Sequence, residues 1–64
     1  MPVIRIDLLE GRTVEQKRAC AEAVTQAFLD TCGGTRASVS VIFTDVAKHD
    51  WATAGRLLSD PKPE

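Results

Sequence analysis

Met1-Pro2-Val3-Ile4-Arg5-Ile6 opens the chain, and this stretch sets the arrangement of everything that follows it. A proline directly behind the first methionine begins an apolar run. Proline has a fixed φ angle and no amide hydrogen, so it suits the first position of a β-strand. The run therefore predicts a strand over residues 2–9. Removal of Met1 would turn the Pro2 nitrogen into a secondary amine that can act as a base, so a structural and a chemical interpretation of Pro2 are both open.

The predicted strand has two different faces, because side chains alternate along a strand. One face is aliphatic and consists of Ile4, Ile6 and Leu8. The other face includes two charges and consists of Val3, Arg5, Asp7 and Leu9. We expect the aliphatic face to meet a helix and the charged face to meet solvent or a partner subunit.

A capping box marks the start of the helix that follows the short loop Glu10-Gly11-Arg12. In Thr13-Val14-Glu15-Gln16 the threonine can cap the helix while the glutamine reaches back to it. The helix is predicted to run to Thr31, because Gly33-Gly34 supplies the positive φ that ends many helices. Steps of three and four residues place one stripe toward the sheet: Cys20, Ala21, Val24, Ala27, Phe28 and Thr31. The opposite face is polar and contains Glu15, Arg18, Glu22 and Gln26.

Residues 38–44 (SVSVIFT) form the second predicted strand, with Val39, Val41 and Phe43 on one face. Strand, helix and strand make a β-α-β unit, whose crossover is right-handed and whose strands are parallel. One helix covers only one face of a two-stranded sheet, whereas parallel sheets are nearly always covered on both faces. The sequence thus predicts a small α/β fold whose sheet is completed by oligomerisation.

The last part of the chain carries weaker signals. Ala52-Thr53-Ala54-Gly55 predicts a short hairpin, and residues 61–64 predict a flexible, proline-broken tail. No linker or internal repeat is present, so we expect residues 1–64 to form a single domain. A chain this short buries only about 60% of its unfolded surface, which again favours oligomerisation.

The composition argues against several classes of function. The net charge is −1, and the eight basic and nine acidic residues are interleaved, so the basic stripe that nucleic acids require is missing. Neither a leader nor a long apolar span is present, which argues against secretion and against a membrane anchor. Cys20 and Cys32 lack the spacing of metal ligands, and we expect them to be reduced thiols in the cytoplasm. We therefore expect no metal site.

Several blocks of the sequence together resemble the 4-oxalocrotonate tautomerase family. They are the proline behind Met1, the blocks Leu8-Leu9-Glu10-Gly11-Arg12-Thr13 and Glu15-Gln16-Lys17, the strand over residues 38–44, and Ala47-Lys48 followed by Trp51. The resemblance covers nearly the whole chain. It implies β-α-β subunits that pair into dimers and assemble as hexamers, with sites built across subunits. It also implies chemistry without a cofactor.

The resemblance further implies the residues of the site. Pro2, freed by the loss of Met1, would be the general base and then the general acid of a keto–enol tautomerisation. Arg12 would hold a substrate carboxylate, Trp51 would wall the pocket, and the Leu9 backbone would contact the substrate. Structural alternatives stay open: Arg12 as a solvated loop cation, and Trp51 as a packing residue.

These roles are chemically reasonable. An α-amino group has a reference pKa of roughly 7.7–8.0, and desolvation and nearby cations both lower that pKa by disfavouring the ammonium form. Such an amine can take a proton from an enol and return it to carbon. Arginine suits carboxylate binding because its planar fork pairs bidentately with the two oxygens.

One position departs from the family's pattern. Many members carry a second active-site arginine in the second strand, where this chain has Ser40. Arg36, Arg56 or Lys48 could supply the charge, a different chain could supply it, or the substrate could carry less negative charge at that end.

Three functional hypotheses follow. The first is a cofactor-independent isomerase that acts on 2-hydroxymuconate or a related enol carboxylate as a homo-oligomer. The second uses the same amine to activate water, hydrating or dehalogenating a 3-haloacrylate-type acid, which requires an additional carboxylate that the sequence does not identify. The third is a non-catalytic subunit of a hetero-oligomer, which Ser40 supports.

Overall fold

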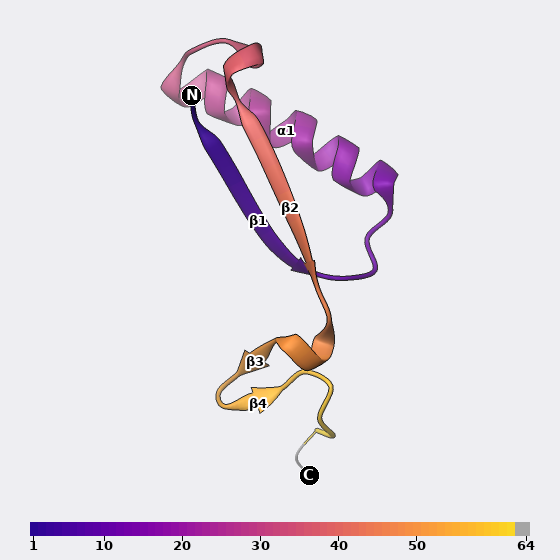
Figure 1. Ribbon diagram of the computed structural model, residues 1–64. Coiled ribbons are helices and arrows are strands. Elements are labelled where there is room, and N and C mark those ends of the chain that lie inside the picture. The colour runs from indigo at the N-terminus through magenta and orange to yellow at the C-terminus, as the bar shows by residue number, and fades with distance from the viewer. Residues whose placement is uncertain (63–64) are drawn as a thin grey trace.

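A computed structural model describes residues 1–62 of the chain (Figure 1). In chain order the elements are β1 (Val3–Leu9), α1 (Val14–Cys32), the 3₁₀ turn η1 (Arg36–Ser38), β2 (Ser40–Val46), the 3₁₀ turn η2 (Lys48–Asp50), β3 (Ala52–Thr53) and β4 (Arg56–Leu57). Within these residues no helix combines the length and the apolar character that a membrane span requires.

The two long strands confirm the predicted β-α-β unit. β1 and β2 pair in parallel, in a register that runs from Val3 opposite Ser40 to Leu9 opposite Val46. Figure 1 shows α1 crossing one side of this two-stranded sheet, so the helix returns the chain from the end of β1 to the start of β2. The fold is therefore the small α/β architecture that the sequence predicts.

The second strand begins two residues later than predicted. Residues 36–38 form a 3₁₀ turn instead, in which both the amide and the hydroxyl of Ser38 donate to the carbonyl oxygen of Thr35. These local hydrogen bonds compete with strand pairing, as serine side chains commonly do. The strand then continues to Val46 because its partner β1 extends to Leu9.

The helix begins and ends as its caps predict. Both hydrogen bonds of the capping box between Thr13 and Gln16 are present. At the other end Gly33 has a φ of 80°, and its amide donates to the carbonyl oxygen of Leu29. The last helical residue is Cys32, one beyond the predicted end.

Four of the six residues predicted for the stripe of the helix turn toward the sheet, and Lys17, Thr25 and Leu29 join them. The residues that turn toward the sheet are Lys17, Cys20, Ala21, Val24, Thr25, Phe28 and Leu29, all half-buried or buried. Ala27 and Thr31 were predicted to lie in this stripe but are exposed. Thr31 lies in the last turn, where its hydroxyl donates to the Ala27 carbonyl oxygen. Ala27 lies at the edge of the stripe, and a sheet of two strands is too narrow to cover that edge.

One copy of the chain encloses no apolar core. Among residues 1–62 no hydrophobic side chain is fully buried. On the sheet face away from α1, Val3 is 52% exposed and Ile42 is 39% exposed. The radius of gyration is 15.4 Å, whereas a compact chain of this length has one of about 11 Å. The sheet face opposite the helix is thus bare, and its covering by a partner remains a prediction.

The predicted hairpin is present beyond the end of β2 (Figure 1). β3 and β4 pair antiparallel around Ala54 and Gly55, which both have positive φ. This is the signature of a type I′ turn, whose twist matches that of the flanking strands. Of the predicted flexible tail, Pro61 accepts a hydrogen bond from Arg56, and residues 63–64 lie outside the described residues.

The turn makes a testable prediction, because Ala54 has a φ of 55°. The left-handed region costs an L-residue with a Cβ about 1–2 kcal/mol, and asparagine tolerates it better than alanine. Ala54→Asn should therefore raise the thermal unfolding temperature. The matched variant Ala54→Val should lower it, because a β-branched residue fits this conformation poorly. A lower unfolding temperature for Ala54→Asn would contradict the type I′ assignment.

Candidate active site

The loop between β1 and α1 carries Arg12 and is held at both ends. At its start the amide of Glu10 donates to the carbonyl oxygen of Val46 at 3.0 Å, which ties the loop to the end of β2. Gly11 then turns the chain with a φ of 121°, a value that favours glycine. At its end Thr13 is fixed by the capping box. Arg12 therefore projects from a short, anchored loop.

Arg12 lies at the edge of a hollow between the helix and the sheet. The volume of the hollow is ≈ 290 Å³, and it is lined by Ile6, Leu8, Arg12, Gln16, Lys17, Cys20 and Phe43. The Arg12 guanidinium makes no hydrogen bond or ion pair within the described part of the chain, residues 1–62. By contrast, the Lys17 ammonium lies 2.7 Å from the Asp45 carboxylate. Arg12 is therefore the cation of this hollow that can receive an incoming anion.

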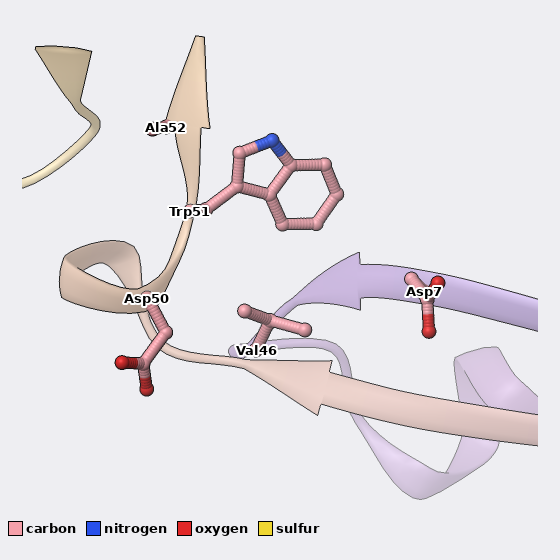
Figure 2. A pocket seen from close by; sticks show the side chains of 5 residues that line it. All are labelled: Asp7, Val46, Asp50, Trp51 and Ala52. Carbon is pink, nitrogen blue, oxygen red and sulfur yellow. The ribbon is translucent and has the colours of Figure 1, made fainter. Parts of the chain in front are cut away.

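Trp51 lies at the same end of the sheet but beside its bare face. It caps η2, and its carbonyl oxygen accepts a hydrogen bond from the Leu58 amide, which fixes it to the hairpin. Together with Asp7, Val46, Asp50 and Ala52 it lines a hollow of ≈ 320 Å³. Figure 2 shows the half-buried indole ring projecting toward the side of the sheet that carries Asp7, while the Asp50 carboxylate extends away from the ring.

Pro2 lies at the opposite end of β1. It is half-buried, and its carbonyl oxygen accepts a hydrogen bond of 3.0 Å from the Ser40 amide. Met1, which blocks its nitrogen, is 91% exposed. Ser40, the position where the family's second arginine is expected, is therefore a direct neighbour of Pro2.

One copy of the chain does not bring the predicted site residues into a single pocket. Leu9, Arg12 and Trp51 lie at the carboxyl end of the strands, with Arg12 on the helix side and Trp51 on the bare side. Pro2 lies at the other end of β1, about 20 Å away along a strand of this length. A site that uses Pro2 with Arg12 or Trp51 must therefore combine residues from more than one subunit.

The structure adds polar residues that the sequence did not single out. Lys17 lines the same hollow as Arg12 and pairs with Asp45, and Asp7 lines the same hollow as Trp51. Asp45 lies opposite Leu8, on the face of the sheet that meets the helix. This position could not be predicted from the sequence, because it depends on the register of the two strands. The position of Asp7 on the charged face of β1 was predicted, but the nearness of Trp51 was not.

The remaining reactive side chains belong to no cluster. Cys20 is half-buried and Cys32 is exposed, and both are free thiols. Twelve residues of helix separate them by about 18 Å, which is too far for a disulfide within one chain. No group of three or more potential metal ligands occurs among residues 1–62.

The fold is a small β-α-β unit, and comparison with known proteins identifies its family. A family model described as "Tautomerase enzyme" matches residues 2–61. The chain therefore belongs to the tautomerase family, and it is an isomerase.

Individual relatives refine this assignment. The 2-hydroxymuconate tautomerase of Bacillus subtilis is 42% identical over 60 residues, which are 94% of this chain and 97% of the relative. The crystal structure of YwhB, a homologue of 4-oxalocrotonate tautomerase, superposes with a TM-score of 0.90 at 39% identity and covers 95% of this chain and 100% of that one. A heterohexamer 4-oxalocrotonate tautomerase from Chloroflexus aurantiacus gives a TM-score of 0.89 at 31% identity, covering 97% of this chain and 100% of that one. The resemblance to the 4-oxalocrotonate tautomerases is thereby confirmed.

The capping box predicts how firmly the Arg12 loop is held. Thr13→Ala removes the hydroxyl that accepts from the Gln16 amide and should destabilise the chain by about 1 kcal/mol, measured by chemical denaturation. Thr35→Ala is the matched control, because Thr35 precedes η1 without a side-chain capping bond and its removal should have little effect. Equal losses in the two variants would contradict this role for Thr13.

Proposed function

We propose that this tautomerase catalyses the keto–enol conversion of a 2-hydroxymuconate-like enol carboxylate without a cofactor, using the Pro2 amine exposed by removal of Met1. The observation that carries the proposal is the position of Pro2 at a half-buried strand start, with its nitrogen blocked only by the exposed Met1. Membership of the tautomerase family supports the reaction class, and the 2-hydroxymuconate tautomerase relatives support the substrate class.

The reaction requires one group that both accepts and returns a proton. The Pro2 nitrogen takes the proton of the substrate 2-hydroxyl, and the O–H electron pair forms the new carbonyl bond. The double bonds shift along the chain, and the prolyl ammonium delivers its proton to the distal carbon of the conjugated system. Desolvation in general lowers the pKa of an amine and so favours its free-base form. A base whose pKa lies near the working pH is the most effective.

Arg12 is assigned to the substrate carboxylate. Its guanidinium makes no ion pair or hydrogen bond within residues 1–62, so binding an anion breaks no described contact. A hydrogen bond to a charged group is worth about 1.5–3 kcal/mol, which corresponds to roughly 10- to 150-fold in kcat/KM. Trp51 is assigned to the pocket wall, and the Leu9 backbone to a substrate contact.

The working enzyme is proposed to be a homo-oligomer, with the hexamer of three dimers as the assembly that the resemblance implies. Three observations support an oligomer: one copy encloses no apolar core, one sheet face is bare, and Pro2 lies far from Arg12. The heterohexamer from Chloroflexus aurantiacus makes a hetero-oligomer the alternative.

The charge that Ser40 does not supply was predicted to come from Arg36, Arg56 or Lys48 if this chain provides it. Arg36 is bonded to Glu22 and Gln26, and Arg56 is bonded to the Pro61 carbonyl oxygen. Lys48 makes no side-chain ion pair or hydrogen bond within that range, and it lies in η2 at the Trp51 end of the sheet. Lys48 is therefore the stand-in that these contacts favour.

A second candidate function is supported by Asp7. Hydration or dehalogenation of a 3-haloacrylate-type acid requires a carboxylate near the pocket to position water, and Asp7 lies in the hollow of Trp51. Turnover of a 3-haloacrylate that is lost in Asp7→Asn, with 2-hydroxymuconate inert, would favour this function. The third hypothesis, a non-catalytic subunit, would require that activity appear only after a paralogous chain is added.

The catalytic role of Pro2 is tested by ketonisation of 2-hydroxymuconate with the purified chain. General acid–base catalysis contributes about 10²- to 10⁴-fold, so Pro2→Ala should lower kcat by a factor in that range. Intact mass spectrometry should show that the active protein lacks Met1. Pro61→Ala is the control for removing a proline elsewhere and should retain activity. Full activity in protein that keeps Met1 would refute the proposal, because an amide nitrogen is not a base.

The assembly is tested at the bare sheet face. Ile42→Asp buries an unpaired carboxylate if a partner covers this face, so light scattering should show dissociation to smaller species. The matched control is Val14→Asp, since Val14 is an exposed apolar residue at the start of α1, where an acidic residue is favourable. An unchanged assembly in Ile42→Asp would show that the bare face is not the interface.

A further inference from the structure

The Arg12 loop is tied to the sheet by the backbone bond from Glu10 to Val46, and to the helix by the capping box between Thr13 and Gln16. A third tie comes from the first turns of the helix. The Lys17 ammonium reaches across to the Asp45 carboxylate at 2.7 Å, and Asp45 is the immediate neighbour of Val46 in β2. The loop leaves β1 and enters α1, and the Lys17–Asp45 pair then connects α1 to β2, which is paired with β1. Arg12 therefore lies in a segment that is closed at both ends by contacts with the sheet.

The Lys17–Asp45 ion pair connects the helix directly to the second strand. Among residues 1–62 it is the one side-chain hydrogen bond or ion pair that joins α1 to β2. Its two side chains are 26% and 45% exposed, so it is partly shielded from water. Since no apolar side chain is fully buried in this copy, packing alone does not fix the start of the helix on the sheet.

Lys17 is also placed against a local preference. Positive charges near the start of a helix oppose the helix dipole, and Arg12 adds a second positive charge to the same hollow. Residues that break a local preference commonly serve tertiary structure or function. Asp45 offsets the charge of Lys17, and it leaves the charge of Arg12 uncompensated.

We propose that the Lys17–Asp45 ion pair positions Arg12 for the substrate carboxylate. It holds the first turns of α1 against β2, so the loop presents the guanidinium in one direction. It also occupies the Lys17 ammonium, so the carboxylate binds Arg12 and not the neighbouring cation. Lys17 and Asp45 act through Arg12 and do not touch the reacting atoms. This inference rests on the proposed function, in which Arg12 binds the substrate.

The test is a double-mutant cycle in the full-length, assembled enzyme, with ketonisation of 2-hydroxymuconate as the assay. Lys17→Met should lower kcat/KM by about fivefold to a hundredfold, mainly through KM, because the misplaced group binds substrate. In an Arg12→Ala background the same substitution should cost less than about twofold, since nothing is left to position. The control is Arg18→Met, which removes an ion pair with Glu15 on the exposed side of the helix and should leave both constants unchanged.

Exchanging the charges tests whether the ion pair itself, and not either side chain alone, is required. Lys17→Asp combined with Asp45→Lys should restore most of the activity that either single substitution removes, at an unchanged assembly size. Losses by Lys17→Met that are equal with and without Arg12 would overturn the inference, as would wild-type constants in Lys17→Met. If Arg12→Ala itself has no effect, the proposed role of Arg12 fails. If Arg12→Ala is impaired and Lys17→Met is not, only the positioning role fails.

Discussion

The structure depends on one constraint: a single helix lies against a parallel sheet of only two strands. Such a sheet has two faces, and α1 covers one of them. The apolar side chains between α1 and the sheet are half-buried at best, and Val3 and Ile42 on the other face remain exposed. Parallel sheets are almost always covered on both sides, and this supports the proposal that contacts between chains supply the hydrophobic free energy missing from one copy. Pro2 and Arg12 are separated within one copy by the length of β1, because Pro2 precedes this strand and Arg12 follows it.

Polar contacts fix much of the local structure in this chain, because none of its apolar side chains in residues 1–62 is fully buried. The loop that carries Arg12 is positioned by a backbone bond, a capping box and the Lys17–Asp45 ion pair. Exposed ion pairs usually contribute little to stability, up to about 1 kcal/mol. In the proposed role of Arg12 their importance lies in geometry, because a group that acts on the substrate can lose about 100-fold in rate when it shifts by about 1 Å.

Two hollows at one end of the sheet differ in the charge of the residues that line them. On the helix side Arg12 offers a positive charge with no described partner, while on the bare side Trp51 lines a hollow together with the acidic residue Asp7. The positive charge of Arg12 attracts an anion, and the negative charge of Asp7 repels one. How far each hollow contributes to a shared site is decided by the partner surface that covers it.

The sequence by itself determined the elements, because their signals are local. Pro2 and the alternating run predicted β1, Thr13 and Gln16 predicted the helix start, and Gly33 predicted its end. It also carried the resemblance that names the family. The start of β2 was misplaced, since the 3₁₀ turn before it is held by hydrogen bonds of Ser38 that compete with pairing. Only the tertiary structure decided that Lys17 pairs with Asp45 and that Trp51 and Asp7 line one hollow. The reason is that contacts between distant residues follow from strand register, which no local pattern encodes.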